Sequence, residues 1–271
     1  MSSPRLGSQG RRVAITGFGV VAPCGLGKDA FWKGLNGPGL TSGRTIEIAD
    51  WDPTPYFDNP KEARRADRVE QFALAAAAEC FEHAGRPAVD DSRFGTIFGT
   101  GVGGLRSIEE QIEVMLTKGE RRVSPFLVPM MMPNASGAAI SMRYGLRGPN
   151  ETITTACAAS THAIGYAARM ISWGMIDACV TGGSESAGCR IGVNSFGNMT
   201  ALSTEGRSVP FSPERDGFVL GEGAAAFMLE EWSLAEARGA TIYGEVLGAA
   251  SNADAEMTAK LLEAGADAGQ P

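Results

Sequence analysis

The stretch Glu151–Gly174 (ETITTACAASTHAIGYAARMISWG) constrains the fold most, because it joins an extended run directly to a helix. Thr152–Thr155 is rich in β-branched residues, which favour a strand, and apolar residues then recur at helical spacing from Ile164 to Ile171. Cys157 therefore lies at a strand-to-helix junction, where unpaired N–H groups and the helix dipole favour a thiolate. The position fits either a reactive nucleophile or a buried structural cysteine, and by itself favours neither.

The composition narrows the class of protein. The 271 residues suffice for one large domain or two small ones, and a 44% hydrophobic content supports a sizeable core. A net charge of −7 argues against a general nucleic-acid binder. No run of about 18 apolar residues predicts a membrane span, and the N-terminus lacks the apolar core of a signal peptide. Five cysteines without CxxC spacing indicate reduced thiols in a cytoplasmic protein, and two histidines provide no metal-ligand cluster.

The chain alternates between β-prone and helical segments, which predicts an α/β protein with a buried sheet. We expect residues 1–10 to form a disordered tail. We expect strands at 13–16, 93–100, 152–155, 177–181, 224–230 and 242–249. We expect helices at 29–35, 69–83, 105–117, 135–144 and 233–238, together with a helix and loop at 188–202. Ser233 is the expected cap of the helix at 233–238.

A basic stretch, which contains Lys61, Arg64, Arg65 and Arg68, precedes the helix expected at 69–83. One interpretation is a solvated start of that helix. Cations are disfavoured near a helix N-terminus, however, so the stretch also hints at an acidic partner.

An ordered set of motifs covers about residues 11–255. It comprises RRVAITGFGVVAPCGLG, GTGVGGLRSIEEQ, VSPFLVPMMMPNASG, YGLRGPN, TTACAASTHAIGYAARMI, ACVTGGSES and PFSPERDGFVLGEGAAAFMLEE. The set resembles the β-ketoacyl-acyl-carrier-protein synthases, in particular the elongating type II condensing enzymes of fatty-acid synthesis and their polyketide relatives.

The resemblance implies an α/β, thiolase-like fold. Its N-terminal βαβαβαββ half would be complete at 11–240, and 241–271 would begin a mostly missing second half with a divergent tail. The implied activity is an acyl transfer followed by a condensation. The acyl group moves from carrier-protein phosphopantetheine to a cysteine and then condenses with malonyl-carrier protein to a β-ketoacyl thioester.

The resemblance also assigns residues and partners. Cys157 matches the nucleophile, and Val102 and Phe196 match positions that line the acyl pocket. Phe126–Gly137 matches a dimer-interface region. The implied partners are acyl-carrier protein and either a second copy or a complementary synthase subunit, with no cofactor beyond the carrier's phosphopantetheine. The positions that match the carrier-docking face are Lys61, Arg64 and Arg65.

The sequence also departs from the family pattern. The two catalytic histidines, the lysine beside one of them and the Gly-Phe-rich loop of the family's second half have no counterpart here. His162 follows Cys157 by five residues, about 140° around the helix, so we do not expect it to reach the thiol. His83 is expected to interact with a helix C-terminus. We therefore predict an impaired condensing enzyme. The alternatives are a non-catalytic module that binds carrier protein or pairs with a synthase subunit, and a thiolase-type enzyme acting on coenzyme A thioesters.

Overall fold

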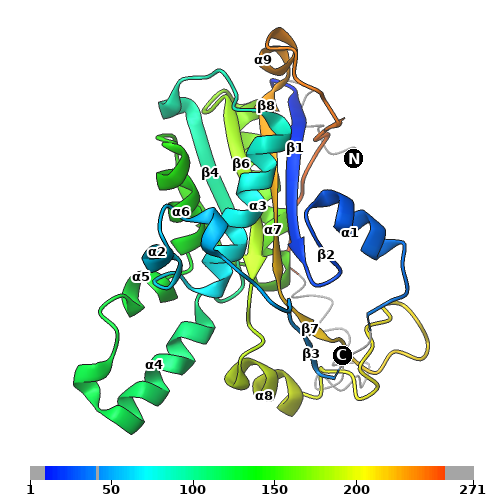
Figure 1. Cartoon of the computed structure of the whole chain (residues 1–271). Helices are drawn as coiled ribbons and strands as arrows, with labels where there is room; N and C mark the ends of the chain where they lie inside the picture. The colour runs from blue at the N-terminus through cyan, green and yellow to red at the C-terminus, as the bar shows by residue number, and fades with distance from the viewer. Residues whose placement is uncertain (1–9, 41–42, 254–271) are drawn as a thin grey trace.

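The computed structural model describes residues 10–40 and 43–253. Within them, the main sheet has the strand order β2-β1-β8-β6-β4-β5, and β9 pairs with β1. Figure 1 shows β1, β8, β6 and β4 side by side. Two further short strands, β3 and β7, pair in parallel away from this sheet. The bounds are β1 Val13–Ala22, β2 Gly25–Leu26, β3 Thr45–Ile46, β4 Phe94–Gly99, β5 Asn150–Ile153, β6 Ala178–Glu185, β7 Leu220–Gly221, β8 Gly223–Glu231 and β9 Gly244–Glu245.

The strand register brings three chain segments together at one edge of the sheet. Strand β4 runs parallel to both β5 and β6, and Gly99 is opposite Ile153 on one side and Gly183 on the other. Because these parallel strands end at the same level, the segments that follow them meet there. Strand β8 is antiparallel to β6 and β1.

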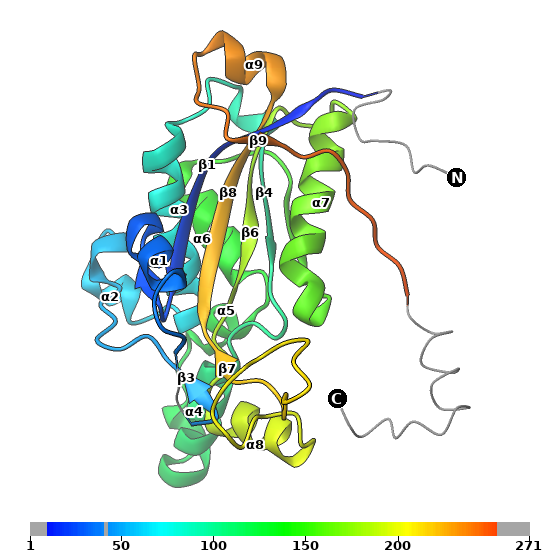
Figure 2. The same cartoon turned by 90° about the vertical axis from the view of Figure 1, so that its right-hand side faces the viewer.

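Helices cover both faces of the sheet. Helices α3 and α6 lie on one face and α7 lies on the other, as Figure 2 shows with the sheet seen nearly edge-on. The bounds are α1 Lys28–Leu35, α2 Pro60–Ala63, α3 Arg68–Ala84, α4 Leu105–Lys118, α5 Leu127–Met131, α6 Ala135–Tyr144, α7 Ala159–Ser172, α8 Arg190–Asn198 and α9 Trp232–Ala237. The expected α/β class with a buried sheet is confirmed.

Each face of the sheet has its own hydrophobic core. Phe72 of α3 packs with Phe94 and Phe98 of β4 on one face, and all three are buried. On the other face, the alanines of α7 pack among β-strand residues such as Ile97 and Leu229. Burying one such side chain contributes about 1.5–3 kcal/mol. The two cores therefore hold the helices on both faces of the sheet, which gives three layers of helix, sheet and helix.

A cluster of ion pairs lies at the other end of the sheet, where β4 and β6 begin. The Asp177 carboxylate accepts hydrogen bonds from Arg93 and from Arg11, the latter at 2.7 Å. The Arg93 and Arg11 guanidinium groups also donate to the carbonyls of Gly174 and Ile171 near the end of α7. Arg93 first, and then Arg11, lower the pKa of Asp177 to about 2 against its partial burial.

Three expectations need correction. Strand β1 continues to Ala22 rather than stopping at residue 16, because Gly17 and Gly19 lack side chains that would collide with α3. The strand expected at 242–249 is reduced to Gly244–Glu245. Helix α9 is capped by the Glu231 carboxylate, which accepts from the backbone of Leu234, so the expected cap at Ser233 is wrong. The expected tail at 1–10 lies almost entirely outside the described residues, and the tail after 253 entirely so.

Candidate active site

Cys157 lies in a short 3₁₀ turn, Ala156–Ala158, between β5 and the first residue of α7. Cys157 is exposed, which argues against its interpretation as a buried structural cysteine. Ala156, directly before it, has φ 50°, in the left-handed region that non-glycine residues adopt rarely. A strained residue of this kind is typical of functional turns, where the surrounding structure imposes the geometry.

Two glycines let α7 begin directly against the sheet. A Cβ on Gly99 would lie 2.5 Å from the carbonyl carbon of Ala159 and 2.7 Å from the nitrogen of Ser160. A Cβ on Gly183 would collide with the Ser160 hydroxyl. Because neither glycine carries a side chain, the N-terminus of α7 and the Cys157 turn sit directly at the ends of β4 and β6.

Both histidines have hydrogen-bond partners other than the thiol. His162 Nδ1 lies 2.8 Å from the Thr155 hydroxyl, which ties the first turn of α7 to the end of the preceding segment. His83, in the last turn of α3, pairs its Nε2 with the Tyr243 hydroxyl at 2.8 Å and accepts from the Phe18 N–H at Nδ1. Within residues 10–40 and 43–253, no hydrogen bond joins either histidine to Cys157.

Val102 lies in the turn that follows β4, beside the Cys157 turn. The position of a Cβ on Gly101 is 3.9 Å from the Ala156 Cα, so the two turns are in contact. Val102 is 46% exposed. Glu185, at the end of β6, accepts from the backbone N–H of Gly101 at 2.7 Å.

Phe196 lies on α8 and packs edge-on against Phe218, with ring centroids 5.5 Å apart. Phe218 is paired through its backbone with Ala201 and Ser203, so the loop after α8 is held against the segment before β7. Asp216 secures this loop by accepting from the hydroxyls of Ser203 and Thr204.

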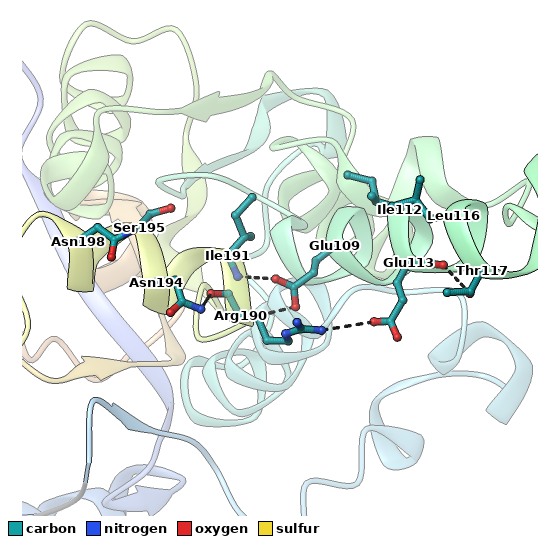
Figure 3. A pocket seen from close by; sticks show the side chains of 10 residues that line it. All are labelled: Glu109, Ile112, Glu113, Leu116, Thr117, Arg190, Ile191, Asn194, Ser195 and Asn198. Carbon is teal, nitrogen blue, oxygen red and sulfur yellow. Dashed lines mark hydrogen bonds and ion pairs between the residues drawn. The ribbon is translucent and has the colours of Figure 1, made fainter.

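An open groove of about 460 Å³ separates α4 from α8 (Figure 3). Glu109 of α4 accepts from the N–H of Arg190 at 3.1 Å and from the N–H of Ile191, so it satisfies the N-terminus of α8. Ser195 and Asn198, on either side of Phe196, line the groove, whereas Val102 and Phe196 themselves do not. The groove is therefore not a cavity lined by the two predicted pocket residues.

The predicted docking residues form an exposed basic face on α2 and the turn after it. Lys61, Arg64 and Arg65 are exposed, and no carboxylate within the described ranges forms an ion pair with them. The Arg65 guanidinium lies over the Phe126 ring, 4.1 Å from its centroid. Arg68, the fourth member of the sequence pattern, instead pairs with buried Glu222 and is structural.

Glu185 is the residue that sequence analysis missed. A carboxylate at the end of the buried strand 177–181 was visible in the run Gly182-Gly183-Ser184-Glu185. Its contact with Gly101, 84 positions away, produces no periodic pattern in the sequence. Across residues 10–40 and 43–253, no group of three potential metal ligands occurs, and none of the helices there is long and apolar enough to cross a membrane.

The comparisons with known proteins agree with this geometry. Residues 39–235 match the family model described as "Beta-ketoacyl synthase, N-terminal domain". The chain is 39% identical to 3-oxoacyl-[acyl-carrier-protein] synthase 2 of Vibrio cholerae over 90% of its own length and 64% of that protein. It is 38% identical to the Staphylococcus aureus protein of the same name, covering 92% and 64%. The chain thus spans slightly less than two thirds of the length of these relatives.

Solved ketosynthases share the fold. "The ishigamide ketosynthase/chain length factor" superposes with a TM-score of 0.79 at 29% identity, covering 88% of this chain and 63% of that one. A "type II PKS acyl-carrier protein in complex with its ketosynthase" gives 0.74 at 26% identity, covering 87% and 67%. The expected thiolase-like fold is confirmed by these neighbours. With its exposed cysteine at the start of α7, the chain belongs to the β-ketoacyl synthase family.

Proposed function

We propose that this chain accepts an acyl group on Cys157 from an acyl-carrier-protein thioester, as the first step of β-ketoacyl synthesis in fatty-acid or polyketide elongation. The observation that carries the proposal is the exposed cysteine on a strained turn at the N-terminus of α7, in a chain of this family. The thiolate is the nucleophilic form, and the helix N-terminus favours negative charge on it.

The proposed transfer exchanges one thioester for another. The Cys157 sulfur attacks the acyl carbonyl carbon, and the resulting oxyanion collapses with cleavage of the bond to the phosphopantetheine sulfur. The thiol proton of Cys157 ends on the released carrier thiol, so no oxidant or cofactor of the chain's own is needed. The backbone N–H of Cys157 is the proposed oxyanion donor, a contribution of about 3–4 kcal/mol in related acyl transfers.

The proposed partner is an acidic acyl-carrier protein. Lys61, Arg64 and Arg65 provide an exposed cationic face without internal ion pairs, which suits an acidic surface. A solved relative was captured as a ketosynthase in complex with its acyl-carrier protein. We also propose that the chain acts in the cytoplasm and pairs with a second synthase subunit. Exposed Leu116 and Val128 on α4 and α5 support such pairing.

The condensation step needs catalytic groups beyond the cysteine. Decarboxylation of malonyl-carrier protein places negative charge on an enolate oxygen, which requires nearby donors. His162 is hydrogen-bonded to Thr155, and His83 is hydrogen-bonded to Tyr243 and Phe18. Neither histidine is therefore the expected donor to the enolate oxygen. We therefore expect acyl transfer with little condensation by this chain alone. Efficient condensation by the unaccompanied chain would contradict this expectation and exclude the alternative of a non-catalytic binding module.

The test measures carrier thiol released on mixing the chain with a stoichiometric acyl-carrier-protein thioester. We expect about one equivalent of thiol per wild-type chain and none with Cys157→Ala. Cys24→Ala, which removes another non-buried cysteine, is the matched control and should behave as wild type. Reversing the charge of Lys61, Arg64 and Arg65 together should slow release from the carrier but not from a small pantetheine thioester. Equal release by Cys157→Ala would overturn the proposal.

A further inference from the structure

We propose that Glu185 is a positioning residue for the nucleophile: its carboxylate fixes the Gly101–Val102 turn against Ala156 and so holds Cys157 in its exposed conformation. The functional part of this inference rests on the proposed acyl transfer, whereas its structural part does not.

The first step of the argument is the contact set of the Glu185 carboxylate. One oxygen, Oε2, accepts from the Gly101 N–H at 2.7 Å and from the Thr100 hydroxyl at 3.4 Å. The other oxygen, Oε1, accepts from the Ser186 N–H at 3.2 Å. One side chain of β6 thereby satisfies the Gly101 N–H and the Thr100 hydroxyl in the turn after β4, where no regular secondary structure provides an acceptor.

The second step links this turn to the nucleophile. A Cβ on Gly101 would lie 2.7 Å from Glu185 Oε2 and 3.9 Å from the Ala156 Cα, so the turn is wedged between the carboxylate and Ala156. Ala156 has φ 50°, a conformation that persists only where its neighbours enforce it. Removing the carboxylate frees the turn, and Ala156 can then relax toward an ordinary backbone conformation that reorients Cys157.

The third step is the support behind Glu185. The next residue, Ser186, donates its hydroxyl to Glu222 Oε2 at 2.9 Å, and Glu222 is bound by the Arg68 guanidinium at 2.6 Å. Glu222 also accepts from the Ile48 N–H at 2.8 Å. The end of β6 is thus tied to the start of α3. Burial raises the pKa of the Glu185 carboxyl, although its backbone partners oppose the shift.

The test compares three replacements that separate reach, hydrogen bonding and charge. Glu185→Gln keeps the length and one carbonyl acceptor, Glu185→Asp keeps the charge but is one methylene shorter, and Glu185→Ala keeps neither. Positioning predicts that acylation of Cys157 falls in the order Glu, Gln, Asp and Ala. The Ala variant should lose about tenfold or more, the scale expected for losing hydrogen bonds to a charged group. The matched control is Glu245→Gln. Glu245 lies on β9, and its carboxylate pairs with Arg12.

A second readout does not require any acyl transfer. Amide hydrogen exchange of Gly101 and Val102 should accelerate in Glu185→Ala and Glu185→Asp, remain closer to wild type in Glu185→Gln, and stay unchanged in Glu245→Gln. Unchanged exchange of these amides in Glu185→Asp, or full acylation by Glu185→Asp together with loss in Glu185→Gln, would overturn the inference. Absence of acylation by the wild type would instead overturn the proposed function, while the exchange measurement would still decide the role of Glu185. Circular dichroism identifies any variant that does not fold, and the Gln and Asp variants keep the test decisive.

Discussion

At the scale of single residues, the turn around Cys157 depends on side chains that are absent as much as on those present. Gly99, Gly101 and Gly183 leave room for the start of α7, for Glu185 and for the strained Ala156. A nucleophile needs access from solvent and a fixed backbone, and this combination provides both. The small residues that sequence analysis interpreted as space for a substrate therefore also serve the packing of the turn.

Glu70 is a residue whose ionisation opposes folding. It lies in the first turn of α3, where burial, and secondarily the nearby charge of Asp67, raise its pKa to about 8. Between its ordinary pKa, near 4.3, and about 8, the unfolded chain has lost this proton while the folded chain still holds it. Stability therefore decreases as pH rises through this window, by up to about 1.4 kcal/mol per pH unit.

We predict that Glu70→Gln removes this pH dependence. Relative to pH 5, the variant should gain stability over wild type at pH 8 by an amount on the order of 4 kcal/mol, measured by urea unfolding. Glu214→Gln, at an exposed carboxylate, is the control and should not change the difference between the two pH values. An equal stability change at both pH values would show that Glu70 is ionised in the folded chain.

At the scale of elements, the pair Arg68–Glu222 joins α3 to the ends of β6 and β7. The Glu222 side chain is 1% exposed, and the Arg68 guanidinium binds both of its oxygens. Burial alone would raise the pKa of Glu222, but Arg68, Ile48 and Ser186 together lower it. Removing one partner of such a pair leaves an uncompensated buried charge.

Arg68→Met should accordingly destabilise the chain by about 3–5 kcal/mol, measured by urea unfolding at pH 7. Combining it with Glu222→Gln should recover part of that loss, because no buried charge remains unpaired. Arg12→Met, which breaks the exposed pair with Glu245, should cost much less stability than Arg68→Met. A similar loss of unfolding free energy in the Arg12 and Arg68 variants would contradict the role of the Arg68–Glu222 pair in joining α3 to the sheet.

Sequence reasoning located most elements but missed the contacts between them. The junction at Cys157 was predictable because a β-branched run and a helical pattern adjoin within a few residues. The sequence groups Arg68 with the other cations of the basic stretch, but it does not reveal that Arg68 binds Glu222, which is 154 positions away. Likewise, nothing local indicates that Phe196 packs against Phe218 or that Glu185 holds Gly101. The docking and pocket roles of Lys61, Arg64, Arg65, Val102 and Phe196 remain predictions.

At the scale of the whole molecule, one sheet sets the arrangement of the proposed reaction. Parallel strands β4, β5 and β6 end together, and the three following segments supply the Gly101–Val102 turn, Cys157 and Glu185. The basic face on α2 lies at the start of α3, whose first residue, Arg68, is tied through Glu222 and Ser186 to the residue next to Glu185. A line of contacts therefore runs from the start of α3, which four residues separate from the end of α2, to the turn beside the nucleophile.

The most direct test of this account is to locate the acyl group by peptide mapping after incubation with an acyl-carrier-protein thioester. Trypsin should release residues 148–169, a peptide in which Cys157 is the only cysteine. The account predicts that this peptide carries the acyl mass and loses it in Cys157→Ala. An acyl group found on another cysteine, or no acyl group on a chain that circular dichroism shows to be folded, would contradict it.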